Sequence, residues 1–336
     1  MPDTEFILDI RDLAVRYHTD SGVVCAVEGL NLSLKPGEFL GLVGETGAGK
    51  TTTALSVMQL IASPPGEICR GEILFDGLNL LTLSEEEKRH IRGGKIAMIF
   101  QDPMTSLNPV LSVQEQIEEM ISLHSAIPRE KVHEKAGEML TLVGIQAERG
   151  SEFPYQFSGG MKQRVMIAIA LACSPQLLIA DEPTTALDVT IQAQVLELMQ
   201  ELKHHFNTAT ILISHDLGVV AELCDSVAIM YAGRIVEKGS AASIYNSPMH
   251  PYTQGLFNSI PDLTTIVSRL NTIPGLPPDP VNLPPGCCFA PRCHKASPMC
   301  TESSPQIKEI DSGHFVACFH PSCSKPSSHK EACHEQ

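Results

Sequence analysis

The sequence predicts an α/β fold with a largely parallel sheet, followed by a smaller unit of different composition. Three observations carry this prediction. Strand-type runs alternate with helix-like segments, the runs are apolar throughout, and proline and cysteine gather toward the C-terminus. Of the 24 prolines and 11 cysteines among 336 residues, 13 and 7 lie after residue 250. This length exceeds what one hydrophobic core usually serves, so we expect a large domain plus an appendage.

The elements of the first part can be assigned in chain order. The strand-type runs are Phe39–Val43, Ile96–Phe100, Leu177–Ala180, Thr210–Ile213 and Val227–Tyr231, and the helix-like segments include Thr51–Leu60, Val132–Val143 and Thr190–His204. Runs that are apolar throughout are typical of parallel strands covered on both faces. From Pro251 onward, the pairs Pro277-Pro278 and Pro284-Pro285 disfavour long helices and central strands. That part therefore needs another source of order.

The charge balance and the apolar stretches exclude several functional classes. With 24 Lys+Arg against 39 Asp+Glu, the formal net charge is −15, which argues against a protein that binds nucleic acid through phosphate attraction. The N-terminus does not have the pattern of a secretory leader. The longest uncharged stretch, Val165–Ala180, is shorter than the roughly 20 residues of a membrane span. We therefore expect a cytosolic chain whose thiols are not paired in disulfides.

A glycine-rich stretch directly follows the first apolar run. Gly44-Glu45-Thr46-Gly47-Ala48-Gly49-Lys50-Thr51, with Thr52 behind it, matches the pattern G-x-x-x-x-G-K-[ST] of a phosphate-binding loop, or P-loop. The glycines let successive backbone N–H groups face one anion, and the helix N-terminus adds partial positive charge. Lys50 would reach the β- and γ-phosphates, and Thr51 would bind Mg²⁺. The alternative is an ordinary glycine-rich turn, but the strand before and the helix after favour a nucleotide site.

Two further segments suit phosphate chemistry. The run Leu177–Ala180 carries Asp181 to the end of a strand, where an open α/β sheet places its ligands, and there Asp181 suits Mg²⁺ while Glu182 could orient or deprotonate water. Ser158-Gly159-Gly160 precedes an apolar helical stretch and could offer a second helix N-terminus to a phosphate. Taken alone, the first could be a strand that meets solvent and the second a plain N-cap.

The order of these segments along the chain decides between the alternatives. The P-loop is followed by Gln101 after a strand, Ser158-Gly159-Gly160, Asp181-Glu182, Ala186-Leu187-Asp188 and His215. This series resembles the ATP-binding-cassette ATPases, the nucleotide-binding subunits of membrane transporters, over roughly residues 6–245. The expected fold class is thus an α/β P-loop NTPase of ATP-binding-cassette type. Residues 1–250 would form the nucleotide-binding domain, about 104–172 its helical subdomain, and 251–336 a Pro/Cys-rich C-terminal extension.

The resemblance implies a role for each of these side chains. Tyr17 would stack on adenine, Gln101 would sense the γ-phosphate, join the magnesium site and touch the transmembrane partner, and His215 would act with Glu182 in catalysis. Ser158-Gly159-Gly160, with Asp188 nearby, would close over ATP held by the opposite subunit. The signature Phe157-Ser158-Gly159-Gly160-Met161 departs from the commonest family form at its first and last positions, which puts only the closing contacts in doubt.

The C-terminal extension contains a spaced set of thiols. Cys287, Cys293, Cys300 and Cys318 could supply the folding energy that a segment with little apolar mass lacks, because four soft thiolates can share one metal centre. Structural zinc usually draws on tighter pairs, whereas these gaps fit a [4Fe–4S] cluster, and a resemblance to dipeptide-importer ATPases selects the same four. Zinc and plain free thiols remain alternatives. Cys288, Cys323 and Cys333 are supernumerary, and Cys25, Cys69, Cys173 and Cys224 are expected to be ordinary packing residues.

Narrower resemblances indicate a function in import. Gln101–Pro109, Phe157–Arg164, His250-Pro251-Tyr252-Thr253 and the extension are similar to the dipeptide and oligopeptide importers, although nickel, glutathione and antimicrobial-peptide systems share much of this pattern. The expected protein is an ATPase subunit, peripheral on the cytoplasmic face of the inner membrane. It would use ATP and magnesium with a second cassette ATPase in a heterodimer, two transmembrane permease subunits and an extracytoplasmic solute-binding protein, without nucleic acid. A soluble cassette ATPase or an iron–sulfur redox regulator are the alternatives of another class.

Overall fold

The main sheet confirms the predicted α/β core. The computed structural model describes residues 5–185, 188–259 and 272–322. Within them, one sheet has the strand order β11-β12-β10-β9-β3-β8-β7-β6. Its parallel part consists of β3 (Phe39–Val43), β6 (Ile96–Ile99), β7 (Leu177–Asp181), β8 (Ala209–Ile213) and β9 (Ser226–Tyr231). All five strand-type runs of the sequence are therefore strands, with ends that differ by at most one residue.

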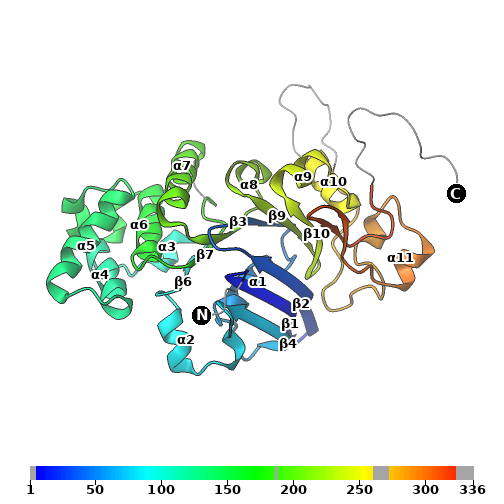
Figure 1. Ribbon diagram of the computed structural model, residues 1–336, viewed down its shortest axis with the longest axis horizontal. Helices are drawn as coiled ribbons and strands as arrows, with labels where there is room; N and C mark the ends of the chain where they lie inside the picture. The colour runs from blue at the N-terminus through cyan, green and yellow to red at the C-terminus, as the bar shows by residue number, and fades with distance from the viewer. Residues whose placement is uncertain (1–4, 186–187, 260–271, 323–336) are drawn as a thin grey trace.

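A second, antiparallel sheet was not predicted. It has the order β2-β1-β4-β5, formed by β1 (Leu8–Thr19), β2 (Gly22–Leu34), β4 (Gly66–Phe75) and β5 (Leu78–Asn79). Pairing between β1 and β2 shifts register at three places, so the strands carry bulges and no clean alternation of apolar and polar residues. In Figure 1 this sheet lies below the main sheet, with α1 (Lys50–Val57) nearby.

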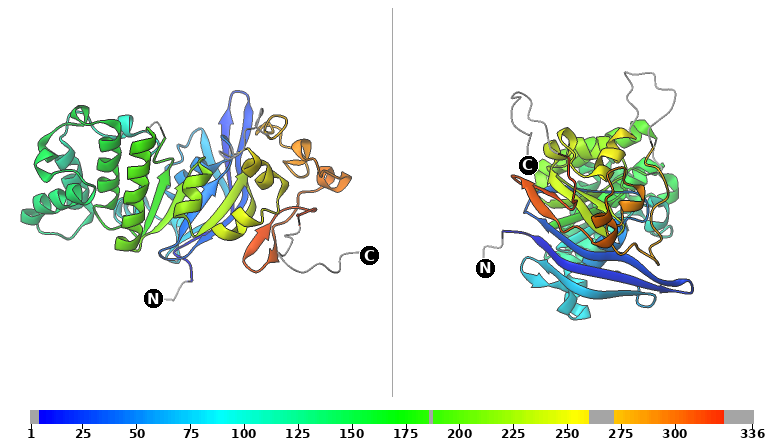
Figure 2. Two further views of the ribbon diagram at one scale, coloured as in Figure 1. Left: turned by 90° about the horizontal axis from the view of Figure 1, so that it is seen from above. Right: turned by 90° about the vertical axis from the view of Figure 1, so that its right-hand side faces the viewer.

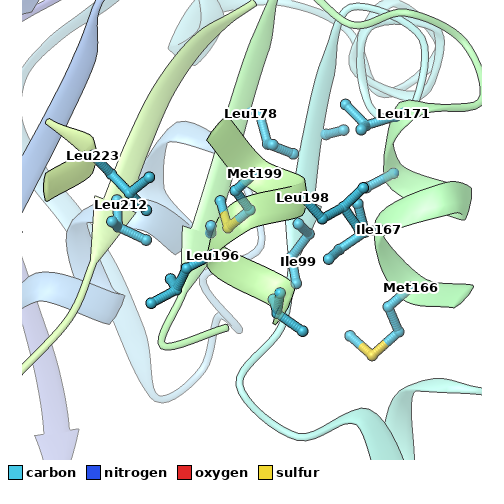
Figure 3. Packing of buried hydrophobic residues seen from close by; sticks show 14 of the residues in the cluster. Ile99, Met166, Ile167, Leu171, Leu178, Leu196, Leu198, Met199, Leu212 and Leu223 are labelled. Carbon is cyan, nitrogen blue, oxygen red and sulfur yellow. The ribbon is translucent and has the colours of Figure 1, made fainter. Parts of the chain in front are cut away.

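Buried apolar residues fill both faces of the main sheet. Leu177 and Ile179 of β7 belong to one cluster, whereas Leu178 and Ala180 of the same strand belong to the other. The cluster that contains Leu178 and Ala180 is covered by α6 (Gly159–Leu171), α7 (Val189–Phe206) and α8 (Leu217–Leu223). Ile167, Met199 and Leu223 of these helices appear beside Leu178 and Leu212 in Figure 3. The apolar strand runs thus have the physical cause that the sequence predicted.

The remaining helices lie around this core and at the two ends of the molecule (Figures 1 and 2). A group at one end contains α4 (Val113–His124) and α5 (Arg129–Leu142), close to α6 and η2 (Ala147–Ser151). Ser112 and Glu115 form a capping box that starts α4, and Ser84 and Glu87 do the same for α2 (Glu85–Ile91). The short elements are η1 (Leu80–Thr82), α3 (Pro103–Ser106), η3 (Pro154–Gln156), α9 (Ala241–Asn246) and η4 (Ala290–Arg292).

The C-terminal extension joins the main sheet at its edge. It contains α10 (Pro251–Asn258), α11 (Pro298–Glu302) and the hairpin of β11 (Lys308–Asp311) with β12 (His314–Val316), which pairs antiparallel with β10 (Arg234–Ser240). As the prolines predicted, its helices are short and its strands lie at the sheet edge. Among the described residues, no helix combines the length and apolar character that a membrane span needs.

Candidate functional site

The P-loop connects β3 to α1, and its Gly44 and Gly49 are sterically required. A Cβ on Gly44 would lie 2.2 Å from the Met230 carbonyl oxygen, and one on Gly49 would lie 2.4 Å from that of Ala26. Gly49 also has φ 101°, a left-handed conformation at the residue before α1. The backbone therefore curls tightly before the first turn of the helix, as an anion cradle needs.

Lys50 is buried at the base of this loop. Its Nζ donates to the carbonyl oxygens of Gly44 at 2.7 Å and Glu45 at 3.1 Å. Burial lowers the pKa of Lys50, while the carboxylates of Glu182, Asp181 and Glu45 act in the opposite direction. A positive group held among backbone oxygens and acids can meet a phosphate without moving far.

Asp181 ends β7 beside the P-loop and is 3% exposed. Burial raises the pKa of Asp181, and a hydrogen bond from the Thr51 side chain partly lowers it again. Its Oδ1 atom is buried and has no hydrogen-bond partner among the residues that the structure describes. An orphaned carboxylate oxygen next to a threonine hydroxyl is a donor set that fits Mg²⁺, a hard cation that prefers oxygen ligands.

Three side chains converge on Oε2 of Glu182. Gln101 Nε2 donates to it at 2.9 Å and Thr185 Oγ1 at 2.8 Å, and His215 Nδ1 lies 3.4 Å away. The Glu182 backbone has φ 47°, and its N–H donates to the Ile213 carbonyl of β8. A non-glycine residue in this conformation is uncommon and is typical of functional sites. Thr185 was not predicted; its only signal in the sequence is its position three residues after Glu182.

Most of these groups line one cavity of about 850 Å³, although Asp181 and Thr185 are not among its lining residues. Its walls include the whole P-loop with Thr52, together with Tyr17, Gln101, Glu182 and His215. The structure thus brings most of the predicted nucleotide site together. Among the lining residues that were not predicted, Leu256 and Pro280 belong to the C-terminal extension.

The predicted signature lies away from this cavity in the same chain. Ser158 caps α6 by accepting a hydrogen bond from Met161 N at 3.4 Å, and Asp188 caps α7 by accepting one from Ile191 N at 3.0 Å. Ser158 and Gly159 are exposed, whereas a Cβ on Gly160 would meet Ile191 at 2.2 Å. Ala186 and Leu187 lie outside the described residues. An exposed helix N-terminus is available to a phosphate that comes from elsewhere.

The four proposed cluster cysteines line one small pocket in the C-terminal extension. Lys295 N donates to Cys293 Sγ at 3.4 Å and His320 N to Cys318 Sγ at 3.3 Å. Burial raises the pKa of the Cys287, Cys293 and Cys318 thiols, that of Cys318 to about 11. Thiols with amide donors around one pocket fit thiolate ligation in their chemistry. In the described part of the chain, however, no three His, Cys, Asp or Glu side chains are arranged to hold a metal ion.

The other cysteines differ partly from expectation. Cys224 is buried, which raises the pKa of its thiol to about 12, and it packs in the core as predicted. Cys69 is exposed on β4, so its prediction as a packing residue was wrong. The charged and partly exposed strand around it, with Glu67 and Arg70 as neighbours, does not bury its side chains. Cys323 and Cys333 lie outside the described residues.

Comparisons with known proteins agree with this geometry. The family described as "ABC transporter" matches residues 27–185, and "Oligopeptide/dipeptide transporter, C-terminal region" matches residues 236–300. The chain is 50% identical to the oligopeptide transport ATP-binding protein OppD of Bacillus subtilis, over 95% of this chain and 90% of that protein. It is 49% identical to OppD of Escherichia coli, over 94% of this chain and 93% of that protein.

A solved structure shows the same fold. It is a dimeric, post-hydrolysis state of the ATP-binding cassette MJ0796 bound to ADP and Pi. Its TM-score is 0.62 at 26% identity, and the match covers 70% of this chain and 98% of that one. Together with the P-loop, the buried Asp181 and the polar groups around Glu182, these matches show that the chain belongs to the ABC transporter family, as an ATP-hydrolysing cassette.

Proposed function

We propose that the chain hydrolyses ATP to power the import of dipeptides and oligopeptides across the cytoplasmic membrane. The convergence of Gln101, Thr185 and His215 on Glu182, which lines the P-loop cavity, is the observation that supports the motor. The peptide cargo is supported by the match of residues 236–300 to the oligopeptide/dipeptide C-terminal region and by the two OppD relatives.

In this proposal, each group of the site contacts a different part of ATP. Tyr17 stacks on adenine, the P-loop amides and Lys50 hold the β- and γ-phosphates, and Thr51, Asp181 and Gln101 hold Mg²⁺. The metal ion, when bound, neutralises charge on the phosphate oxygens. The Ser158-Gly159-Gly160 face and Asp188 of one cassette complete the site of another.

Hydrolysis then requires a general base for the attacking water and a group that holds the γ-phosphate in position. Glu182 is placed to accept a proton from a water whose oxygen attacks the γ-phosphorus, as the bond to the bridging oxygen of ADP breaks. Gln101 and Thr185 fix the Glu182 carboxylate by donating to Oε2, which leaves Oε1 for the water. His215 steadies the γ-phosphate.

The proposed assembly includes further subunits. A second cassette forms a heterodimer with this chain, two permease subunits provide the path, and an extracytoplasmic solute-binding protein delivers the cargo. The chain is peripheral on the cytoplasmic face of the inner membrane. The dimeric cassette MJ0796 supports the pairing of two cassettes.

Transport measurements test the cargo. In cells that lack their own copy, the chain should restore uptake of radiolabelled dipeptides, and Lys50→Ala, which removes the phosphate-binding cation, should not. Uptake of nickel, glutathione or an antimicrobial peptide instead would assign one of the other cargoes. If the chain co-purified only with soluble partners from solubilised membranes, a soluble cassette ATPase would replace the transporter.

We further propose that Cys287, Cys293, Cys300 and Cys318 hold a [4Fe–4S] cluster. The four thiols around one pocket support the proposal, as do the amide donors to sulfur. Anaerobic purification should give about four iron and four sulfide ions per chain if this is correct. Zinc without sulfide would favour a mononuclear site. ATPase rates that followed cluster oxidation more closely than cargo supply would favour a redox regulator.

A further inference from the structure

We propose that Arg292 of the C-terminal extension is a positioning residue for ATP, which it serves by holding and neutralising Glu45 of the P-loop. Arg292 Nη1 donates to Glu45 Oε2 at 2.7 Å, and Nη2 donates to Oε1 at 3.1 Å. The two residues are 247 positions apart in sequence. This parallel two-bond geometry is the strongest form of arginine–carboxylate pairing.

The remaining donors of Arg292 are also used. Nε donates to the Pro274 carbonyl at 3.0 Å, Nη1 also reaches Tyr231 Oη at 3.3 Å, and Nη2 reaches the Ile273 carbonyl at 3.5 Å. The side chain is 5% exposed. Five contacts match the five N–H donors of a guanidinium, a number that a lysine could not provide. Arg292 is therefore fixed in place and is not a surface charge that happens to meet Glu45.

A second residue of the extension holds the same P-loop position. The backbone N–H of Glu45 donates to Tyr252 Oη at 2.9 Å, and Tyr252 is fully buried. Its ring packs against Tyr231 and Phe289, with centroids 4.5 and 5.4 Å apart. Both the side chain and the amide of Glu45 are thus bound by residues beyond position 250, while its carbonyl accepts from Lys50.

The charge of Glu45 makes this contact matter for the nucleotide. Glu45 lines the same cavity as Lys50, so its free carboxylate would repel a triphosphate. The ion pair of Glu45 with Arg292 has no net charge to oppose binding, and its two hydrogen bonds fix the orientation of the carboxylate. The extension therefore sets the affinity of the cassette for ATP, whatever the cargo of the transporter.

Nucleotide titrations of the full chain test this inference. Arg292→Gln should raise the Kd for MgATP about tenfold, because it leaves the carboxylate of Glu45 unpaired beside the triphosphate. Adding Glu45→Gln to that variant should restore the Kd to within about threefold of the parent. Arg11→Gln, which removes an exposed cation on β1, is the matched control and should leave the Kd unchanged.

The variants separate neutralisation from a purely structural role. If Arg292 only docked the extension, the double variant would bind as weakly as Arg292→Gln, and that result would overturn the inference. A Kd for Arg292→Gln within twofold of the parent would also overturn it. Should Arg292→Gln not fold, Glu45→Gln alone decides: it should bind MgATP at least as tightly as the parent, and a Kd raised more than about threefold would contradict the inference.

Discussion

Glu182 shows at the scale of one residue how the fold prepares a base. Its backbone is left-handed, with φ 47°, directly after the end of β7, and Gln101 and Thr185 hold one of its carboxylate oxygens. Such a conformation costs free energy, of order 1–3 kcal/mol, and persists only where the surroundings enforce it. The backbone hydrogen bond to Ile213 and the two side-chain donors are that enforcement.

The first residue-scale prediction concerns this base. Glu182→Gln should keep MgATP binding, because the amide retains the size of the carboxylate, but it should lower hydrolysis about 10²–10⁴-fold because the amide cannot accept a proton. Phosphate release from the assembled complex and nucleotide titration measure the two effects. Glu72→Gln, on an exposed part of β4, is the control with the same chemical change. Normal turnover by Glu182→Gln would remove Glu182 as the base.

A second prediction concerns Asp181, where one substitution should raise the stability of the protein and abolish its activity. Burial raises the pKa of Asp181 in the folded state above its value of about 3.9 in an unfolded chain. The folded state therefore holds this proton more tightly, and the stability that the protonated form contributes is lost as pH rises through the folded pKa. Asp181→Asn should accordingly raise the midpoint of thermal unfolding at pH 7, without nucleotide or Mg²⁺, and should abolish Mg²⁺-dependent hydrolysis.

The pH dependence provides the check on this cause. As pH falls to about 4, the Asp181 carboxyl of the parent takes up a proton, so the difference in unfolding midpoint between Asp181→Asn and the parent should shrink. Calorimetry at pH 4 and pH 7 measures it. An Asp181→Asn variant that was less stable than the parent at pH 7 would show that the carboxylate is stabilised in the apo protein.

At the scale of elements, one buried carboxylate adds to the strand pairing that joins the hairpin β11–β12 to β10. Glu237 of β10 is fully buried and accepts hydrogen bonds from Met249 N at 2.7 Å and His250 N at 2.9 Å. The same carboxylate lies 2.7 Å from Nε2 of His314, which belongs to β12. One side chain thus connects the sheet edge, the start of α10 and the hairpin.

Replacing this carboxylate should therefore loosen the extension. Glu237→Gln puts an amide N–H₂ against groups that donate, so at least one buried donor loses its partner at a cost of about 2–4 kcal/mol. Denaturant unfolding should show that loss, and amide hydrogen exchange should show it first in β12. The matched control is again Glu72→Gln. Equal protection of β12 in variant and parent would mean that the strand pairing alone holds the hairpin.

The same scale explains what the sequence could predict. The parallel strands were predictable because burial on both faces requires unbroken apolar runs, such as Leu177–Ala180. The antiparallel sheet was not, because β1 and β2 mix charged and apolar residues across bulges. The hairpin β11–β12 was missed as well. Its first strand is exposed throughout, and the residues of β10 that pair with β12 lie almost 80 positions earlier (Glu237 with Val316), so no local pattern marks the pair.

At the scale of the whole molecule, contacts between segments that are far apart in the sequence could not be predicted either. The P-loop motif predicted Lys50 and Thr51 because the chemistry depends on residues within eight positions. The pair of Glu45 with Arg292, and the place of Leu256 and Pro280 in the cavity wall, depend on how the extension folds back over the cassette. The signature Ser158-Gly159-Gly160 also predicted that Ser158 contacts a phosphate, but Ser158 does not line the cavity of its own chain.

That separation leads to a prediction about the assembled transporter. Ser158 is the N-cap of α6, and both Asp and Asn are good N-caps, so Ser158→Asp and Ser158→Asn should fold equally well. If the N-terminus of α6 meets the γ-phosphate of ATP held by the partner cassette, Asp places a negative charge against that phosphate, whereas Asn does not. ATPase activity of the complex should fall at least tenfold further with Asp than with Asn.

Nucleotide binding by the isolated chain is the necessary counterpart. Ser158 does not line the cavity that contains Lys50, so both variants should bind MgATP with the Kd of the parent. A loss of binding in the isolated Ser158→Asp chain would place the residue in its own site. Equal ATPase rates for the two variants in the complex would mean that no phosphate approaches α6. Hydrolysis depends on closure of two cassettes only if the negative charge at position 158 lowers the ATPase rate of the complex and leaves MgATP binding by the isolated chain unchanged.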